Sequence, residues 1–372
     1  MRILIYSPAF LPSIGGLEIG QALLADCLAR RGHQVTVVTR TPPAAGAAGA
    51  TGAASPAGAT SATSAASAAG NAGAKAAAAA FQVLRRPRPL ALLRAVRRCD
   101  VFFQANVSLR GLWPLLLVRR PWAVSHHSWY CRSDGHVAWQ DRLKRYLLRF
   151  AAVSISVSAA MAADLDTPSL VIPNAYRDHL FRRLPEVERE VDLIFLGRLV
   201  SDKGVDLLIA ALGQLAERGL RPHLTVVGDG PELPRLRGQA ERLGVAAQVE
   251  LLGTRRDGDL VPLLNRHRIL VMPSRYNEPF GVAALEGIAC GCVVVGSAGG
   301  GLPEAIGPCG IVFPNGSVTD LAAVLADLLR HPERQVALRA GAAEHLASHA
   351  SERIAGLYHE ALTAIDAASG GD

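Results

Sequence analysis

The sequence predicts an α/β protein made of two doubly wound parallel sheets, and three observations lead to this prediction. Strand-like and helix-like hydrophobic periods alternate along the chain. The order strand, glycine-rich loop, helix, strand occurs near residue 1 and again from about residue 191, which is typical of two Rossmann-like domains. The 372 residues, half of them hydrophobic, suffice for two full cores.

The N-terminal half begins with the apolar run RILIYSPAF, residues 2–10, which predicts a buried strand. A helical spacing of apolar residues follows in EIGQALLADCLARRGH, residues 18–33, and a second strand is predicted by QVTVVTR, residues 34–40. Because Pro8 interrupts the first run so early, we do not interpret it as a signal peptide. We therefore expect a cytoplasmic protein.

A low-complexity segment interrupts this half. Residues 44–80 consist of Ala, Gly, Ser and Thr apart from Pro56, Asn71 and Lys75. Such a composition cannot form a core, so it predicts a disordered insertion. The strand-like FQVLRRP, residues 81–87, resumes the pattern directly afterwards, which argues against a domain boundary there.

The same rhythm returns in the second half, where VDLIFLGRL, GVDLLIAALGQLAERG and RPHLTVVGDG predict strand, helix and strand. Polar and charged residues separate the two halves in PNAYRDHLFRRLPEVEREV. We therefore place an N-terminal domain at residues 1–180 and a C-terminal domain at residues 181–351. The helical spacing at about 352–368 predicts a last helix that joins the N-terminal domain.

Two glutamates lie at either end of an apolar stretch in RYNEPFGVAALEG, residues 275–287. Pro279 suits the first position of a helix, so we expect a helix from there to about Gly291. Glu278 would then lie on the preceding loop and Glu286 about two turns inside the helix. A helix start presents free N–H groups and partial positive charge to a phosphate, so the carboxylates would flank an anion.

Two further loops follow predicted strands. GGLE contains Gly15 and Gly16, which let the backbone approach a ligand closely, although such a turn is weak evidence by itself. GRLVSDKG carries Arg198 and Lys203, which could clamp a diphosphate from two sides. Surface salt bridging is the alternative interpretation of these two cations.

In this order, the segments resemble the signature set of the family 4 retaining glycosyltransferases, which have the GT-B fold. The resemblance rests on GGLE, IPNAY, FLGRLVSDKGVDLLIAAL, VVGDGPE, VMPSRYNEPFGVAALEGIACG and GGLPE. It covers nearly the whole chain outside residues 44–80, and the glutamate pair with seven residues between is its most specific element. The fold implies two domains that face each other across a cleft.

The resemblance also implies a role for each residue of a sugar-donor site. Glu286 would bind the ribose hydroxyls of a sugar nucleotide, and Glu278 would hold the sugar. Arg198 and Lys203 would bind the diphosphate, together with backbone N–H groups at the helix start. The expected donor-binding residues are therefore Gly15, Gly16, Arg198, Lys203, Glu278, Phe280, Gly281 and Glu286.

Members of this family also carry a histidine that faces the donor sugar, after a short strand of the N-terminal domain. Here the strand-like PWAV leads into SHHSWY, so His126 and His127 are the candidates. We favour His127, because a small residue and then an aromatic follow it, and keep His126 as the alternative. The expected catalytic residues are His127, Glu278, Arg198 and Lys203.

The chain departs from the family pattern in three places. Ala175 and Arg177 stand where the family tends to show Gly and Asp, which makes the contact to the nucleotide less certain there. Ser128 follows His127 where Gly or Asp is common, and the insertion at 44–80 is unusually long. None of these departures removes a charge that the donor site needs.

The resemblance implies transfer with retention and without a metal ion. Two Asp-x-Asp triplets occur, Asp164 to Asp166 and Asp257 to Asp259, but both fit helix ends and turns better than metal ligands. No cofactor is expected beyond a nucleoside-diphosphate sugar as substrate, linked to UDP or GDP. A sugar-nucleotide epimerase and a non-catalytic nucleotide-sugar-binding protein remain as alternatives. A dehydrogenase is excluded, because no G-x-G-x-x-G follows the first strand.

Charge is distributed unevenly along the chain. Residues 1–180 carry 20 Lys and Arg against 8 Asp and Glu, a net of +12, while the remainder carries a net of −5. The arginines crowd into LRRPRPLALLRAVRRCD and RLKRYLLRF, interleaved with apolar residues, which predicts a peripheral surface for anionic lipid. A solvated arginine-rich surface is the simpler alternative. Nucleic acid is disfavoured, because zinc-finger and RNA-recognition signatures are absent and aromatics are few.

This surface predicts an acceptor that is a glycan or lipid-linked, and recruitment that weakens with salt. The arginines expected to carry it are Arg85, Arg86, Arg88, Arg94, Arg97 and Arg98.

Overall fold

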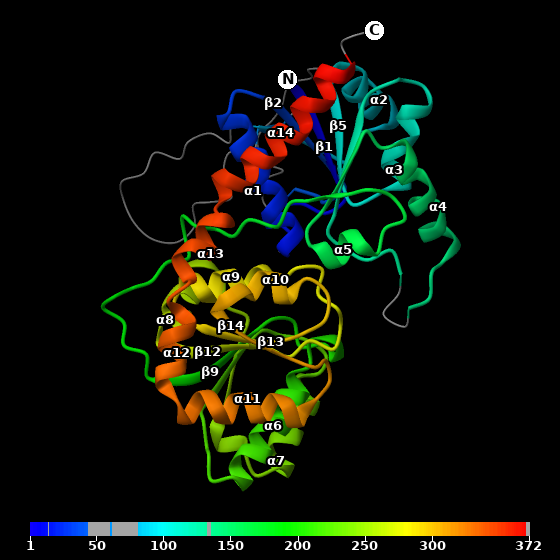
Figure 1. The fold of residues 1–372 in the computed structure, drawn as a ribbon. Helices are drawn as coiled ribbons and strands as arrows, with labels where there is room; N and C mark the ends of the chain where they lie inside the picture. Colours follow the sequence, from blue (N-terminus) through cyan, green and yellow to red (C-terminus); the bar gives the residue numbers. More distant parts are fainter. Residues whose placement is uncertain (14, 44–59, 62–80, 132–134, 370–372) are drawn as a thin grey trace, which may run out of the picture. The chain divides into compact units, whose positions relative to one another are not determined.

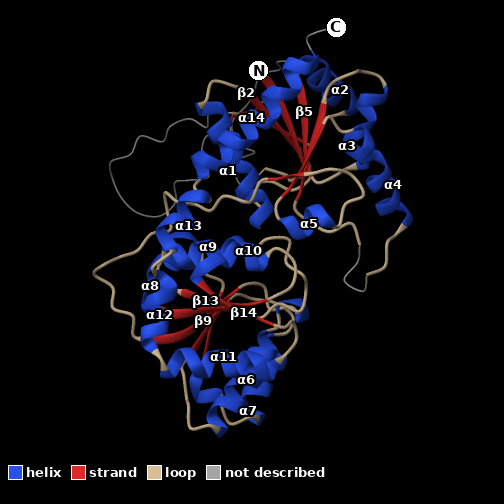
Figure 2. Cartoon of the chain, viewed as in Figure 1, coloured by secondary structure: helices blue, strands red, loops and turns tan. Residues whose placement is uncertain are grey.

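The computed structural model describes residues 1–13, 15–43, 60–61, 81–131 and 135–369, which form two compact α/β units (Figures 1 and 2). Unit 1 comprises Met1–Pro173 and Ser351–Asp372, and unit 2 comprises Asn174–Ala350. The first division lies at residue 173 and not at residue 180. Residues just after it bond within unit 2, since the N–H of Tyr176 donates to the carbonyl of His349 over 3.4 Å.

Unit 1 is built on an eight-stranded sheet with the order β3-β4-β2-β1-β5-β6-β7-β8, in which only the β3–β4 pair is antiparallel. Every residue of the central strands β5 and β6 is buried, as expected for a parallel sheet covered on both faces. The strands are β1 (Arg2–Ser7), β2 (Gln34–Thr39), β3 (Thr60–Ser61), β4 (Gln82–Arg85), β5 (Val101–Ala105), β6 (Trp122–His126), β7 (Val153–Ser156) and β8 (Leu170–Val171). The predicted insertion at 44–80 lies outside the described residues except for β3.

Six helices and two short 3₁₀ turns accompany this sheet in the described residues. They are α1 (Gly16–Arg30), α2 (Pro89–Arg98), α3 (Leu109–Leu112), η1 (Trp113–Leu116), α4 (Trp139–Leu147), η2 (Leu148–Phe150), α5 (Ala159–Ala163) and α14 (Ser351–Ser369). None of the described helices is both long and apolar enough to span a bilayer.

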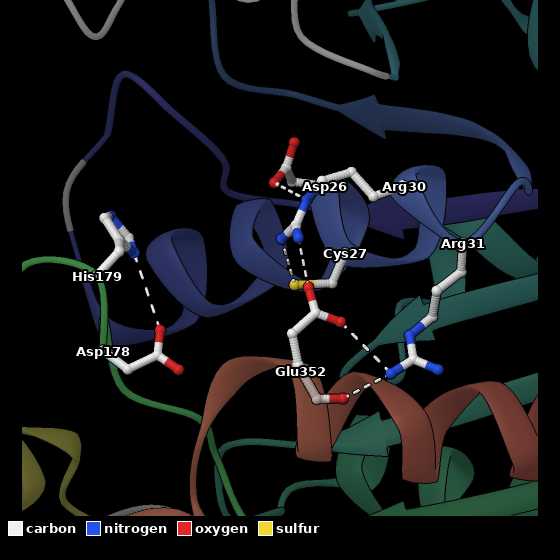
Figure 3. Close-up of polar contacts among 7 residues, drawn as sticks. All are labelled: Asp26, Cys27, Arg30, Arg31, Asp178, His179 and Glu352. Carbon is white, nitrogen blue, oxygen red and sulfur yellow. Dashed lines mark hydrogen bonds and ion pairs between the residues drawn. The ribbon is translucent and has the colours of Figure 1, made fainter.

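Helix α14 follows unit 2 in the sequence but lies beside α1 in unit 1 (Figure 1). Figure 3 shows the polar contacts that fasten its first turn: Arg30, the last residue of α1, and Arg31, which caps that helix, both reach Glu352. Arg31 donates to the backbone carbonyl of Glu352 over 2.8 Å and also approaches its carboxylate. Further along, the ring of Tyr358 meets that of Phe103 in β5 edge to face at 5.9 Å.

Unit 2 contains a six-stranded parallel sheet with the order β11-β10-β9-β12-β13-β14. Its strands are β9 (Val191–Leu196), β10 (Leu224–Val227), β11 (Val249–Gly253), β12 (His267–Met272), β13 (Val293–Ser297) and β14 (Gly310–Phe313). Its helices are α6 (Val205–Glu217), α7 (Leu233–Arg242), α8 (Leu260–Arg266), α9 (Val282–Ala289), α10 (Leu302–Ile306), α11 (Val318–Arg330), α12 (Pro332–Arg339) and α13 (Ala342–Ser348). In Figure 2, α6, α7 and α11 cover one face of the sheet, while α9 and α10 cover the other.

The core of unit 2 forms where α6 and α11 pack on the central strands. Leu208 and Leu212 of α6 and Leu325 of α11 are fully buried against Val226 and Val271 of the sheet. Branched aliphatic residues fit a pleated surface that is covered on both sides, which explains the nearly continuous apolar runs in these strands. The prediction of two doubly wound α/β units is confirmed.

One predicted element is wrong in its start. Helix α9 begins at Val282 and not at Pro279, because Gly281 has a φ of 113°, a left-handed conformation that cannot continue a helix. The backbone ahead of it is extended, and the N–H of Gly301 donates to the carbonyl of Glu278 over 2.7 Å. Glu286 therefore lies about one turn inside the helix and not two.

Candidate functional site

Two loops meet at the carboxyl edge of the unit 2 sheet, one after β9 and one after β12. Gly204 has a φ of 67°, and a side chain there would lie 1.9 Å from the carbonyl oxygen of Pro273, so only glycine permits this approach. The N–H of Arg275 donates to the carbonyl of Asp202 over 2.9 Å. The guanidinium of Arg275 also binds Asp206 at 2.6 and 2.7 Å, so the two loops are held together on both sides of Lys203.

This contact brings Lys203 and Glu278 into a direct ion pair. The Nζ atom of Lys203 lies 2.6 Å from Oε1 of Glu278, and the hydroxyl of Ser274 donates to the same oxygen over 2.6 Å. The side chain of Glu278 is only 9% exposed. Since both contacts go to Oε1, the other carboxylate oxygen accepts nothing from the described residues. A polar ligand group could bind it there.

Arg198 lies on the same loop as Lys203, directly after β9, and is exposed. The ends of β9 and β10 come very close, because a side chain at Gly228 would lie 1.8 Å from the carbonyl oxygen of Gly197. In the part of the chain that the structure describes, no carboxylate lies within 4.0 Å of the Arg198 guanidinium. Arg198 is thus a cation available to an anion, whereas Lys203 is already paired.

Glu286 is paired as well, and its partner is Arg177. The Nε and Nη2 atoms of Arg177 both lie 3.0 Å from Oε1 of Glu286, and Nη1 donates to Asp257 over 2.5 Å. The guanidinium also stacks 4.7 Å above the ring of Phe181. Burial raises the pKa of Glu286, while the positive charge of Arg177 opposes this increase. Arg177, which departs from the family pattern, therefore binds Glu286, the carboxylate predicted to hold a ribose.

Phe280 and Gly281 lie where the extended segment meets α9. Phe280 is buried, and its ring is 5.7 Å from that of His349. A side chain at Gly281 would come within 2.7 Å of Leu302, so a glycine is needed at this position. Both residues precede the first turn of α9, as their predicted role in diphosphate binding requires, and that role stays a prediction.

In unit 1, His127 follows β6 at the carboxyl edge of the sheet. The backbone N–H of His127 donates to the side-chain carbonyl of Asn106 over 2.7 Å. The Nε2 atom of its ring lies 2.8 Å from the hydroxyl of Ser125 and 3.3 Å from the amide nitrogen of Gln21. Ser125 in turn bonds to Tyr358 of α14. Neutral groups from several elements of unit 1 thus contact His127.

His126 has a different environment. It is completely buried, with Nδ1 2.6 Å from the hydroxyl of Tyr130 and Nε2 2.8 Å from that of Ser154. Burial, with a smaller contribution from the neighbouring His127, lowers its pKa to about 3. Both ring nitrogens of His126 are used in hydrogen bonds inside unit 1. This favours His127 over His126 as the group that meets a substrate.

The glycine loop ahead of α1 is open on one side. A side chain at Gly16 would meet nothing within 4 Å, while one at Gly15 would meet the carboxylate of Glu18 at 2.5 Å. One helical turn later, Gln21 is buried, and its Oε1 atom has no hydrogen-bond partner among the described residues. A ligand above this loop would find backbone N–H groups at the start of a fifteen-residue helix.

The sequence did not predict the contacts that four polar residues make in the two sites. Gln21 was detectable as a polar residue on the apolar face of α1, in line with Leu24 and Leu28. Asn106 follows β5 directly and has a φ of 63°, a conformation that asparagine tolerates better than most residues. Ser274 and Asp257 gave no such signal, because only the fold brings them to Glu278 and Arg177.

The two Asp-x-Asp triplets have structural partners. Asp164 ends α5 and accepts a bond from Arg145 over 2.5 Å, and Asp257 begins the turn before α8 and binds Arg177. Within the described ranges, no group of three or more His, Cys, Asp or Glu side chains could hold a metal ion.

Comparison with known proteins gives matches along both units. The family model described as "Glycosyl transferases group 1" matches residues 177–345, and the model "Glycosyl transferase 4-like domain" matches residues 15–177. A D-inositol 3-phosphate glycosyltransferase from Stackebrandtia nassauensis is 35% identical over 196 residues, which cover 49% of this chain and 44% of the relative. The match thus spans less than half of that relative's length.

Two other proteins match over most of their length. A glycogen synthase from Mycobacterium tuberculosis is 28% identical over 367 residues, covering 89% of this chain and 87% of the relative. The Anabaena protein HepE, solved in complex with UDP, has a TM-score of 0.75 at 20% identity and covers 98% of this chain and 100% of its own. At that identity the structural match shows the fold alone.

Proposed function

Because the chain belongs to the group 1 glycosyltransferase family and has the GT-B fold, we propose that it transfers a sugar from a nucleoside-diphosphate donor, linked to UDP or GDP. The acceptor is a glycan or lipid-linked molecule, and the reaction retains the anomeric configuration without a metal ion. The observation that carries this proposal is the partly buried Lys203–Glu278 pair on the loop that also carries the exposed Arg198.

Departure of a nucleoside diphosphate places negative charge on the phosphates and positive character on the sugar. Arg198 and Lys203 stabilise the first charge, together with the N–H groups ahead of α9. The free oxygen of Glu278 accepts a sugar hydroxyl, and Glu286 accepts the ribose hydroxyls. The acceptor attacks from the face that the phosphate leaves, so no covalent nucleophile is assigned, and His127 contacts the donor sugar.

Support for the donor and acceptor classes is of two kinds. HepE was solved with UDP, and the relative from Stackebrandtia nassauensis is named for transfer to an inositol phosphate. The net charge of +12 on residues 1–180 favours an acceptor at an anionic surface. We therefore place the reaction in the cytoplasm at the inner face of the membrane, in the synthesis of cell-surface polysaccharide or lipopolysaccharide.

A thermal-shift screen tests the sugar-donor site. The purified chain is heated with UDP, GDP, ADP and their common sugars, with and without EDTA, alongside Glu286→Ala. We expect stabilisation by one nucleoside diphosphate that persists in EDTA and weakens in the variant; about 100 Kd of ligand adds roughly 2.7 kcal/mol. Cooperative unfolding with no shift from any nucleotide contradicts the proposal.

The two alternatives are separated by the product. Incubation with the stabilising sugar nucleotide alone, followed by NMR, reveals a new epimer if the chain is an epimerase. With a glycan or lipid-linked acceptor, the anomeric coupling of the product distinguishes retention from inversion. Binding without any product over a range of acceptors supports a non-catalytic nucleotide-sugar-binding protein.

A further inference from the structure

Helix α4 and the turn η2 expose their apolar residues to solvent. Trp139, Leu143, Tyr146 and Phe150 are 70%, 38%, 53% and 66% exposed. Their spacing of four, three and four residues places them along one face of a helix. The rings of Tyr146 and Phe150 also touch edge to face at 5.8 Å, so the face is a continuous apolar surface.

Two cations of the same helix, Lys144 and Arg145, bind other residues of unit 1. Lys144 binds Asp141 over 2.8 Å and lies 5.9 Å from the ring centre of the buried Tyr130. Arg145 donates to the backbone carbonyl and the carboxylate of Asp164, both over 2.5 Å. The side of α4 that faces the core thus carries Lys144 and Arg145 beside Leu147, and no residue of α4 is fully buried.

Helix α2 shows the usual orientation in the same unit. Leu92 and Val96 are buried, while Arg94, Arg97 and Arg98 are exposed. Both helices are strongly amphipathic, so their sequences alone do not reveal which one turns its apolar face outward. Large exposed apolar surfaces mark contact sites on monomeric proteins, and only α4 of this pair has one.

The charges around the α4 face indicate what it contacts. Arg142 and Arg149 are exposed, and the Arg149 guanidinium lies 5.6 Å from the ring centre of Tyr146. The only acid between residues 139 and 150 is Asp141, which is paired with Lys144. Tryptophan, tyrosine, phenylalanine and leucine flanked by arginine, without an exposed acid, suit the headgroup region of an anionic bilayer.

We propose that this α4–η2 face, formed by Trp139, Arg142, Leu143, Tyr146, Arg149 and Phe150, docks on an anionic phospholipid bilayer. The helix lies in the plane of the interface, with its aromatic residues among the headgroups and its two arginines on lipid phosphates. The inference deepens the proposed function, on which it rests for the biological role of the contact. Membrane binding is measured without turnover. A failure of the docking proposal therefore does not imply a failure of the proposed transferase activity, nor the reverse.

Vesicle flotation tests the surface. The full chain is mixed with vesicles of pure phosphatidylcholine or with vesicles containing phosphatidylglycerol, and bound protein is separated on a density gradient. We expect binding to the anionic vesicles that weakens with salt. The variant Trp139→Ser/Tyr146→Ser/Phe150→Ser should bind at least about tenfold more weakly, because three apolar side chains no longer enter the bilayer. The control Leu90→Ser/Val336→Ser changes two equally exposed apolar residues elsewhere and should bind like the wild type.

Charge is tested separately. Arg142→Gln/Arg149→Gln should weaken binding by about fivefold for each arginine. The matched control Arg97→Gln/Arg98→Gln removes two exposed arginines from α2 and should have little effect. If this control lowers binding as much as the α4 variant does, the general basic charge of the N-terminal half is responsible and the proposal is wrong.

Trp139 provides a second measurement. Its emission should shift to shorter wavelength when anionic vesicles are added, and the shift should be absent in Trp139→Phe. The proposal is overturned if folded wild-type protein, verified by cooperative melting, binds neither vesicle type. Self-association that depends on Trp139, without vesicle binding, overturns it in favour of a second copy of the chain.

Discussion

The carboxyl edges of the two sheets carry polar sites of opposite character. In unit 2 the side chains are charged and already paired, Lys203 with Glu278 and Arg177 with Glu286. In unit 1 the side chains that contact His127 include the hydroxyl of Ser125 and the amides of Gln21 and Asn106. Both sites use the same edge of the same kind of sheet, and on the proposed function we expect unit 2 to receive the anionic diphosphate and unit 1 to face the neutral sugar.

The largest effect is expected from breaking the charged pair. Lys203→Ala removes a cation proposed to bind the diphosphate and leaves the nearly buried Glu278 without its partner, so kcat/KM should fall by about 1,000-fold. Release of nucleoside diphosphate measures this loss, and Lys203→Arg should restore part of the rate. Lys144 has a similar exposure and an ion pair outside the site, so Lys144→Ala should retain full activity in solution. A Lys203→Ala enzyme within about threefold of wild type contradicts the comparison.

A smaller loss is expected on the neutral side. His127→Ala should lower kcat by about 100-fold while the KM for the sugar nucleotide changes little, because the contact proposed for His127 is with the sugar and not with the nucleotide. Steady-state kinetics with varied donor measure both parameters. His359→Ala, which removes a histidine paired with His33, is the control. An equal loss in both variants would assign the effect to general destabilisation of unit 1.

Lowering the pH should reduce the stability of the folded chain through the buried His126. The pKa of His126 is about 3 in the folded chain, whereas an unfolded chain protonates near 6.5. The unfolded state therefore binds more protons below pH 6.5, so the free energy of unfolding falls as pH drops from 7 to 5, by about 2 kcal/mol from this group. Urea unfolding at both pH values measures the change. His126→Gln should reduce this pH dependence, even if it lowers stability at pH 7.

The smallest effect concerns Arg177. Its removal in Arg177→Gln should weaken donor binding about tenfold, because Glu286 is then no longer held in place and ionised. Burial already raises the pKa of Glu286, and loss of the guanidinium raises it further, so the pH below which donor binding is lost should move upward. Isothermal titration across pH measures this midpoint.

Two variants separate charge from structure at this position. Arg177→Lys should recover part of the affinity, and Asp257→Asn, which removes only the exposed outer partner, should change it by less than about twofold. An unchanged pH midpoint in Arg177→Gln shows that Arg177 does not act through Glu286.

Much of the fold was predictable because it depends on local hydrophobic period. The alternation around residues 191–230 identified β9, α6 and β10 within a few residues. The start of α9 was not predictable in this way. Pro279 is a good first helical residue, but the left-handed Gly281 and the pairing of Glu278 with Gly300 decide the backbone there. These are contacts between residues distant in sequence.

The site shows the same limit. Spacing and resemblance selected Glu278, Glu286 and Lys203, but only the fold reveals that Lys203 binds Glu278. From the sequence, Arg177 was only a departure from the family pattern, because its partners Glu286 and Asp257 lie 109 and 80 residues away. Periodicity gave the strength of the amphipathic pattern in α4 but not its direction, since the pattern is identical for a helix that faces inward or outward.

Helix α14 gives the molecule an unusual order of completion during synthesis. Unit 2 has all its residues once position 350 has left the ribosome, while the unit that begins at Met1 still lacks the helix that covers α1 and bonds to Ser125. Domains generally fold as units when their sequence is available. A nascent chain halted at residue 350 should therefore contain all of unit 2 but an incomplete unit 1, in which α14 does not yet cover α1.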